Sequence, residues 1–144
     1  MRSLIIFIFF LSSVLADEPP NIKNLLINKE FKTYKNLTFF DSSETELKLD
    51  NFKDNLIMLN FWATWCAPCK EEMPSLDDLQ SNPKLNNLKI FPINVGRDNL
   101  EKSKKFYQEL KINNLEIYFD PPITLAKKLS LRGVPTTIFF NKEG

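Results

Sequence analysis

Short apolar runs alternate along the chain with segments in which apolar residues recur at helical spacing. The apolar runs predict strands at residues 56–63, 88–95, 115–119 and 136–140. The amphipathic segments predict helices at residues 66–80, 99–112 and 123–131. The first run, LIMLNFWA, is interrupted only by Asn60, which is typical of a strand buried on both faces of a parallel sheet. Because strands and helices alternate, the sequence predicts an α/β domain.

Local signals refine this picture at both ends of the domain. Two short apolar runs at 37–40 and 47–49 flank the turn-forming residues Asp41-Ser42-Ser43, so we expect an N-terminal β-hairpin. Pro92 lies inside the second long strand and cannot donate to a ladder, which predicts a sheet edge or a bulge there. Near the C-terminus, we expect Gly133 to close the last helix.

The first sixteen residues have the pattern of a secretory signal peptide. Arg2 precedes an apolar run, and the small-residue site Val14-Leu15-Ala16 is followed by acidic residues. The apolar stretch is shorter than the roughly 20 residues that a spanning helix needs, so we expect cleavage and no stable membrane span. The predicted organisation is a signal peptide at 1–16, a polar arm at 17–36 and one domain at 37–144. Such a protein would be exported, to the periplasm if its source is a bacterium.

Composition excludes several classes of function. The 144 residues, 43% of them hydrophobic, suffice for one compact domain. The 19 Lys and Arg nearly balance the 18 Asp and Glu, so no strong charge recruits nucleic acid. The absence of His excludes Ser-His-Asp and Cys-His catalytic pairs and removes the commonest transition-metal ligand. Three glycines are too few and too scattered for a glycine-rich phosphate-binding loop. The sequence predicts neither a cofactor nor a metal site.

Cys66 and Cys69 are the candidate reactive groups. A structural disulfide stabilises a protein most when it closes a long loop. The two-residue spacer between Cys66 and Cys69 would close a very short loop, so we expect a reactive pair. Cys66 lies at the predicted start of a helix, where unpaired backbone N–H groups and the helix dipole stabilise a thiolate. Pro68 suits the first turn of that helix. We therefore predict that Cys66 attacks a disulfide and that Cys69 resolves the mixed disulfide.

The cysteines belong to one of two motifs that lie far apart in the sequence. The segment 61–74, FWATWCAPCKEEMP, contains W-C-x-P-C, and the segment 133–137, GVPTT, contains V-P-T. Together they resemble the thioredoxin superfamily, specifically its exported TlpA/ResA-type thiol:disulfide reductases. The resemblance covers residues 37–144 and implies a thioredoxin-like fold with a mixed central sheet. It also implies that Pro135 is a cis-proline beside the active site, that the Val134 backbone pairs with the substrate, and that Trp65 covers the disulfide.

The resemblance also draws attention to Glu72 and Asn60. Glu72 lies one helical turn after Cys69 and resembles the acidic residue that such reductases place near their thiols, so it is the candidate general acid/base. The alternative is a solvated helix glutamate like Glu71. Asn60 falls where thioredoxins often carry a buried Asp, and an amide cannot titrate, so Asn60 cannot itself carry the proton. Trp62 is equally consistent with plain packing.

The expected activity is the reduction of disulfides in exported proteins, in cytochrome c maturation or with another client. We expect an upstream thiol reductant, with a membrane-bound protein as one candidate, to reduce the dithiol again after each turnover. The Ala67-Pro68 spacer lacks the His that strong oxidants of this fold often carry between their cysteines, which favours reduction. The alternative is an exported copper-binding or metal-delivery domain, in which two thiolates bind Cu(I) and Met73 is the nearby candidate for a third ligand.

The C-terminal end departs from the thioredoxin pattern. Such chains usually continue from the last predicted strand into an antiparallel strand and a closing helix, whereas this sequence ends at Gly144. We therefore expect a sheet whose final strand and helix are missing, with part of the apolar set Ile138, Phe139 and Phe140 uncovered. The alternatives to an active single domain are an inactive truncated product and a domain completed by self-association.

Overall fold

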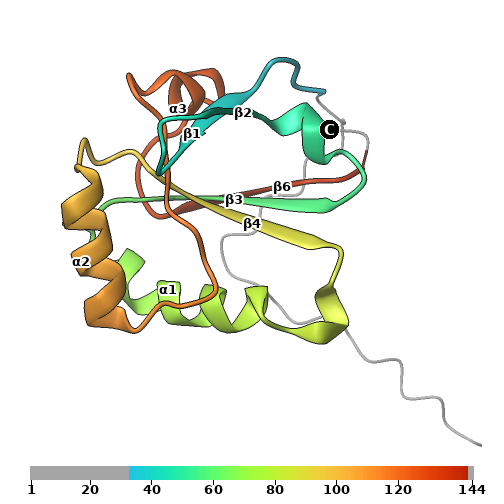
Figure 1. Cartoon of the computed structure of the whole chain (residues 1–144). Coiled ribbons are helices and arrows are strands. Elements are labelled where there is room, and N and C mark those ends of the chain that lie inside the picture. Colours follow the sequence, from blue (N-terminus) through green and yellow to red (C-terminus); the bar gives the residue numbers. More distant parts are fainter. Residues whose placement is uncertain (1–32, 143–144) are drawn as a thin grey trace, which may run out of the picture. The chain divides into compact units, whose positions relative to one another are not determined.

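The computed structural model describes residues 33–142, which form a six-stranded mixed sheet with helices on both faces (Figure 1). The strands are β1 (Thr38–Asp41), β2 (Glu46–Lys48), β3 (Leu56–Trp62), β4 (Leu88–Asn94), β5 (Tyr118–Phe119) and β6 (Thr136–Phe140). The helices are α1 (Ala67–Gln80), α2 (Leu100–Leu110) and α3 (Thr124–Lys128), with short 3-10 turns η1 (Leu49–Phe52) and η2 (Pro83–Leu85). The predicted signal peptide and most of the predicted arm lie outside the described residues.

The strand order β2-β1-β5-β4-β3-β6 confirms the α/β class and the mixed sheet. β3 pairs in parallel with β4 from Leu56–Leu88 to Trp62–Asn94, and β5 pairs in parallel with β4. β6 runs antiparallel to β3. The predicted hairpin is present, because β1 pairs antiparallel with both β2 and β5. The carboxyl ends of β3 and β4 therefore meet at one edge of the sheet, where α1 begins.

Pro92 lies neither at a sheet edge nor at a bulge, because β4 pairs with β3 in unbroken register through Asn60–Pro92, so that prediction is wrong. β4 lies between β3 and β5, and Pro92 is fully buried. The carbonyl of Asn94 accepts from Asp120 N–H on the β5 side, and residues two apart in a strand face the same neighbour. The nitrogen of Pro92 thus faces β5 just before the pairing of β5 with Ile93 begins. The missing donor is tolerated because no ladder bond is needed at that position.

Two predicted elements are shorter than the apolar pattern indicates. The strand expected at 115–119 is reduced to β5, because side chains of the helices take the backbone groups before it: Leu115 N–H donates to Asp77, and Glu116 O accepts from the Tyr107 hydroxyl. The helix expected at 123–131 is reduced to α3. Ser130 adopts a positive φ of 54°, so the chain leaves the helix before it reaches Gly133.

The sheet divides the hydrophobic core into two clusters. One cluster lies between the sheet and helices α1 and α2, and it contains both cysteines together with Trp62, Met73 and Phe106. The Trp62 ring packs on Phe106 with ring centroids 4.7 Å apart. The other cluster lies on the opposite face under α3 and is rich in aromatic rings, among them Phe39, Phe91 and Tyr118. The cysteines are thus embedded in the core on the α1 side.

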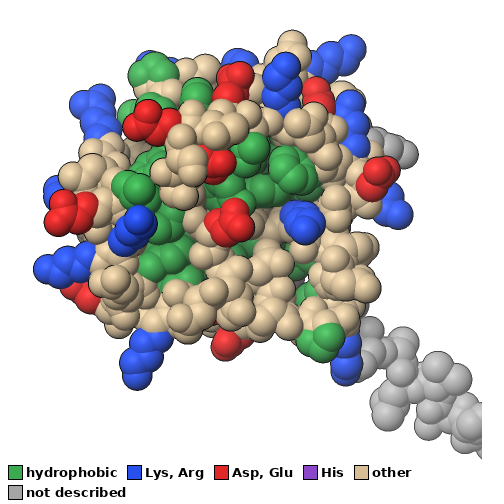
Figure 2. Space-filling model, viewed as in Figure 1, with side chains coloured by type: hydrophobic (Ala, Val, Ile, Leu, Met, Phe, Trp, Pro, Cys, Tyr) green, Lys and Arg blue, Asp and Glu red, His purple; other side chains and the backbone are tan. Residues whose placement is uncertain are grey.

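Strand β6 is an edge of the sheet as far as residues 33–142 show, and no strand or helix follows it within that range. Phe139 on this strand is 53% exposed, whereas Phe140 is buried. Elsewhere, acidic and basic side chains are interspersed around an apolar centre on the face shown in Figure 2. None of the helices in the described part of the chain is long and apolar enough to cross a membrane.

Candidate active site

The two cysteines form a disulfide at the N-terminus of α1, with their Cα atoms 5.3 Å apart. Cys66 is the N-cap residue, and its Sγ accepts a hydrogen bond of 3.2 Å from the backbone N–H of Cys69. A turn leads from β3 into this cap, where Cys66 N–H donates to Ala63 O. Pro68 lies in the first helical turn, where a missing N–H leaves no carbonyl unpaired. The local sequence thus directs the Cys69 N–H, at the start of the helix, toward the first sulfur.

The two cysteines differ in their access to solvent. Cys66 is 4% exposed and Cys69 is 0% exposed, so an approaching reagent meets the first sulfur before the second. Beside them, the two tryptophans differ strongly. Trp65 is 70% exposed, whereas Trp62 is fully buried against Phe106 and Tyr107. The structure therefore makes Trp62 a packing residue and leaves Trp65 at the surface next to the disulfide.

A loop after β4 supports the turn that carries the cysteines. Asp98 Oδ2 accepts hydrogen bonds from Thr64 N–H at 3.1 Å and from Asn94 Nδ2 at 3.2 Å, while Asn94 Oδ1 accepts from Gly96 N–H at 2.8 Å. A Cβ atom on Gly96 would lie 2.6 Å from the Ala63 Cβ and 2.8 Å from Asp98 Oδ2. The loop can approach the active-site turn this closely only with glycine at that position.

The second motif borders the same surface. The peptide bond between Val134 and Pro135 is cis, as the resemblance implied. Val134 and Trp65 both line a groove of about 230 Å³, together with Val95, Ile123, Leu131 and three neighbouring residues. A larger hollow of about 750 Å³ shares Val95 and Ile123 with this groove and extends to the turn between β1 and β2. The fold thus brings Trp65 and Val134, which are 69 positions apart, onto one concave surface.

Glu72 turns inward from α1 toward the sheet. Its Oε1 accepts a hydrogen bond of 2.7 Å from Nδ2 of Asn60 on β3, and the same Nδ2 lies 3.1 Å from Oγ1 of Thr137 on β6. Glu72 is half-buried, whereas Glu71 beside it is exposed. Cys69 and Glu72 are three residues apart and therefore share one face of α1. This arrangement differs from that of a solvated helix glutamate.

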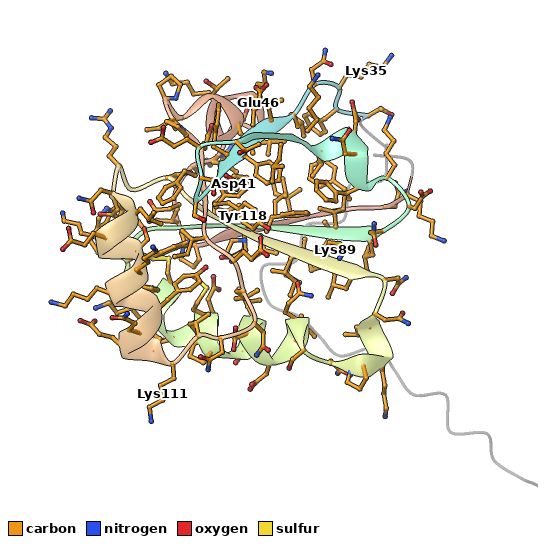
Figure 3. The ribbon with its side chains drawn as sticks, viewed as in Figure 1. Lys35, Asp41, Glu46, Lys89, Lys111 and Tyr118 are labelled. Atoms are coloured by element: carbon orange, nitrogen blue, oxygen red, sulfur yellow. A yellow bond between two sulfur atoms is a disulfide. The ribbon has the colours of Figure 1, made fainter. Side chains whose placement is uncertain are left out.

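Three ionisable groups among the described residues have shifted pKa values. Burial alone would raise the pKa of Asp77, but four hydrogen bonds from Asn113, Asn114 and Leu115 outweigh it and lower that pKa. Burial raises the pKa of Tyr107 well above its usual range, with a contribution from the Asp77 charge. Burial also raises the pKa of Tyr118, which is labelled in Figure 3, and its hydrogen bond to Glu116 raises that pKa further. Asp77 is therefore ionised and both phenols are neutral around pH 7.

Comparison with known proteins places the chain in a family. The sequence profile of the AhpC/TSA family matches residues 27–144. This chain belongs to the AhpC/TSA family. Within the part of this family member that the structure describes, no cluster of three or more His, Cys, Asp or Glu side chains is arranged to hold a metal ion.

Curated relatives of this AhpC/TSA-family chain are named as thiol-disulfide oxidoreductases or thioredoxin-like proteins. It is 30% identical over 99 residues to "Thiol-disulfide oxidoreductase ResA" of Geobacillus kaustophilus, covering 69% of this chain and 56% of that protein. It is 28% identical over 109 residues to ResA of Bacillus subtilis, covering 76% and 60%. It is 33% identical over 101 residues to "Thioredoxin-like protein YneN" of B. subtilis, covering 67% and 56%. The chain thus spans about three fifths of the length of these relatives, and the resemblance to ResA-type proteins is confirmed.

Solved structures support the fold. A "putative Thiol:disulfide interchange protein DsbE" of Chlorobium tepidum superposes with a TM-score of 0.66 at 19% identity, covering 80% of this chain and 82% of that one. The pneumococcal "exposed lipoprotein thioredoxin (Etrx1)" superposes with a TM-score of 0.62 at 24% identity, covering 74% and 82%. The thioredoxin-like fold predicted from the two motifs is therefore confirmed for this AhpC/TSA-family chain.

Some residues of the site were missed by the sequence reasoning. Asn94, Gly96 and Asp98 support the cysteine turn, yet they lie about thirty positions after it and belong to no cysteine motif. A signal was present, because polar residues follow a strand parallel to β3 and the carboxyl ends of parallel strands meet at one edge. The partner of Glu72 was also missed, because Asn60 was considered for its inability to titrate and not for its capacity to donate.

Proposed function

We propose that this protein is a thiol:disulfide oxidoreductase in which Cys66 and Cys69 exchange electrons with disulfides of other proteins. The observation that carries the proposal is the Cys66–Cys69 disulfide at the N-terminus of α1, with the more exposed sulfur at the N-cap. The names of the curated relatives agree with it. The Cys69 N–H directed at the Cys66 sulfur and the positive end of the helix dipole favour the Cys66 thiolate, which is the form that attacks disulfides.

The reaction proceeds through a mixed disulfide. In the reduced protein, the Cys66 thiolate attacks one sulfur of a client disulfide, and the electron pair of the broken bond leaves with the other client sulfur. Cys69 then loses its proton and attacks the Cys66 sulfur, which releases the second client sulfur as a thiolate. Two electrons pass from the dithiol to the client, and the two client thiolates take up protons. Cys66 and Cys69 end in the disulfide seen in the structure.

The client binds across the surface that carries both motifs. Trp65 and Val134 line one groove, and Pro135 continues the chain from Val134 into β6. We assign Val134 to backbone pairing with an extended client segment, with Pro135 holding that segment beside the sulfurs and Trp65 supplying exposed apolar contact. Glu72 is the proposed general acid/base, since it shares a helix face with Cys69.

We further propose that the clients are exported proteins, with apocytochrome c as one client to test, and that an upstream thiol reductant at the membrane recharges the dithiol. The signal-peptide pattern at 1–16 supports export, and mass determination of the mature protein after secretion checks it. Cleavage after Ala16 is the expected result. A chain that retains residue 1 would refute the signal peptide.

The test of the activity uses a model protein disulfide and dithiothreitol as the electron donor. Wild-type protein is expected to accelerate reduction, and Cys66→Ser is expected to abolish the acceleration. After removal of dithiothreitol, reduced Cys69→Ser is expected to accumulate a covalent mixed disulfide with the client, visible on a non-reducing gel, because neither Cys69 nor dithiothreitol is then present to resolve it. A trap in Cys66→Ser but not in Cys69→Ser would reverse the assignment. Wild-type protein that turns over no disulfide but binds one Cu(I) per chain would overturn the proposal in favour of metal binding.

A further inference from the structure

Asn60 is a buried polar side chain whose role the disulfide chemistry leaves unexplained. It is 0% exposed and is the one polar residue of strand β3, whose sequence is LIMLNFW. Its Nδ2 donates to Glu72 Oε1 and to Thr137 Oγ1. Its Oδ1 is buried and has no hydrogen-bond partner among the described residues. An unpaired buried acceptor costs on the order of 1–3 kcal/mol, so a residue that tolerates it calls for a functional explanation.

The surroundings of Glu72 contain few other ionisable groups. Strands β3 and β6 beneath it, LIMLNFW and TTIFF, carry no ionisable side chain. The positions one helical turn away on α1 are Pro68, Cys69, Ser75 and Leu76. Two other elements pack against α1. On β4, the charged residue Lys89 is exposed. On α2, Phe106 contacts α1 at Lys70, whose Nζ lies 5.9 Å from the ring centroid. Among these positions, Cys69 is the titratable group that shares the Glu72 face.

We propose that Asn60 is a positioning residue that holds Glu72 toward Cys69 and hydrogen-bonds Glu72 in both of its protonation states. This inference rests on the proposed function. In the ionised state, Nδ2–H donates to the carboxylate through the contact of Nδ2 with Oε1 seen in the structure. When Glu72 is protonated, rotation of the amide by about 180° brings Oδ1 to the position of Nδ2, where it accepts the carboxyl O–H. Thr137 stays paired throughout, because a hydroxyl both donates and accepts.

The amide favours neither state strongly. When Glu72 is ionised, the Asn60 oxygen lacks a partner. When Glu72 is protonated and the amide has rotated, the Asn60 nitrogen lies at that position and lacks a partner instead, so each protonation state carries the cost of one unpaired atom. An aspartate at position 60 would instead repel the ionised Glu72. An aliphatic residue would leave Glu72 without a partner in either state. Asparagine is thus suited to a carboxyl group that must change its protonation during each turnover.

The proton transfer belongs to the resolving step. In the mixed disulfide, the Cys69 S–H gives its proton to the Glu72 carboxylate as the Cys69 sulfur attacks the Cys66 sulfur. The bond between Cys66 and the client sulfur breaks, its electron pair leaves on the client thiolate, and that thiolate takes a proton from solvent. Glu72 is left protonated, with its O–H donated to Asn60 Oδ1, until it returns the proton to solvent or to Cys69 when the disulfide is reduced again.

The experiment measures the resolving step alone. Reduced protein, freed of other thiols, is mixed with one equivalent of the disulfide dimer of 5-thio-2-nitrobenzoate, which joins one half to Cys66 and releases the other half as a first coloured thiol. Attack by Cys69 then releases the second coloured thiol, and this second release is followed in single turnover from pH 4.5 to pH 9. In wild-type protein we expect release at acidic pH to be faster than Cys69 alone allows. Glu72→Gln should lower the rate near pH 6 by about tenfold or more and merge with wild type at high pH, where hydroxide removes the proton.

Asn60→Ala should reproduce most of the Glu72→Gln loss near pH 6, and the double variant should be no slower than Glu72→Gln. A merely structural role would instead lower the rate equally at all pH values and add to the Glu72 effect. Asn60→Asp keeps the side-chain volume if the alanine variant unfolds, and it should move the profile to higher pH, since two adjacent carboxyl groups share one proton. Glu71→Gln is the matched control and should leave the profile unchanged.

The outcomes separate the two proposals. Wild-type protein that releases no thiol at any pH would overturn the proposed function itself. Wild-type protein that releases thiol with a Glu72-dependent profile, while folded Asn60→Ala and Asn60→Asp both superpose on it, would overturn the role of Asn60 and leave the function standing. Additive losses in the double variant would have the same consequence for Asn60.

Discussion

At the scale of single residues, the two sulfurs of one disulfide have different environments. Both lie in the core cluster on the α1 side, but the Cys66 sulfur receives the Cys69 N–H and Cys66 is 4% exposed, whereas Cys69 is 0% exposed. Sequence spacing alone gives the pair but not this asymmetry, because exposure depends on how the α1 terminus lies against the rest of the fold.

The asymmetry predicts the order of alkylation in the reduced protein. Near pH 7, iodoacetamide should modify Cys66 about tenfold faster than Cys69, because Cys66 combines access with a thiolate-stabilising helix terminus. Quenched time points followed by peptide mapping give the two rates. Cys66→Ser, as control, should label slowly at its remaining cysteine. Labelling of Cys69 first would contradict the assignment of the nucleophile.

Much of the site could be predicted at this scale because its chemistry is local. Cys66, Cys69 and Glu72 lie within seven consecutive positions, so their spacing on a helix already relates them. The hydrogen bonds of Asp98 to Thr64 and of Asn60 to Thr137 join residues 34 and 77 positions apart. No periodicity encodes such partners, and only the folded sheet brings them into contact.

At the scale of elements, one carboxylate of α1 organises the link from α2 to β5. Asp77 is 5% exposed and accepts hydrogen bonds from the backbone N–H groups of residues 113, 114 and 115 and from the Asn114 side chain. One of these bonds takes the Leu115 N–H, the first backbone donor of the strand that the apolar pattern predicted at 115–119. The strand prediction therefore went too far because periodicity reports burial and not which partner a backbone group takes.

Asp77→Asn tests this link. The substitution keeps the shape but places an NH2 group against backbone donors, so the free energy of unfolding at pH 7 should fall by about 2–3 kcal/mol. The pKa of Asp77 is lowered in the folded state, so its stabilising contribution is present above its unfolded value of 3.8 and is lost as the pH falls through the lowered folded value.

Urea unfolding of wild type and variant should therefore show a large difference at pH 7 and a much smaller one at pH 2.5. Asp78→Asn, at the exposed neighbouring position, is the matched control and should change the free energy of unfolding by less than about 0.5 kcal/mol. A difference between wild type and Asp77→Asn that does not vary with pH would contradict the contribution of the charge.

At the scale of the whole molecule, the order of strands determines which surface is open to pairing. Sequence alternation predicted the class and a parallel sheet around β3, and the motifs predicted the thioredoxin-like fold that the structural neighbours confirm. The prediction for Pro92 was wrong because a proline in a strand implies only that one ladder bond is absent. The sequence does not show whether the neighbouring strand is paired at that position, and β5 begins to pair only at Ile93. Strand order is a long-range property that the local pattern leaves open.

The outer side of β6 pairs with no strand among residues 33–142, so we expect the protein to self-associate through edge pairing. Phe139→Lys should shift the association measured by sedimentation velocity to at least about tenfold higher concentration, because a charge at the edge opposes pairing. Leu56→Lys is the matched control, since Leu56 is also an exposed apolar residue but lies on the interior strand β3, and it should associate like wild type. Wild-type protein that is monomeric at every concentration would contradict the prediction.

The placement of the tryptophans has a spectroscopic consequence. The chain has two of them, and both lie within four positions of Cys66, one in the core and the other 70% exposed. A disulfide quenches nearby indole emission, so the emission of the whole protein reports on this single bond. The redox state of the protein can therefore be followed without a label. Trp65→Phe leaves a blue-shifted emission that acrylamide quenches poorly, and Trp62→Phe leaves a red-shifted one that it quenches readily.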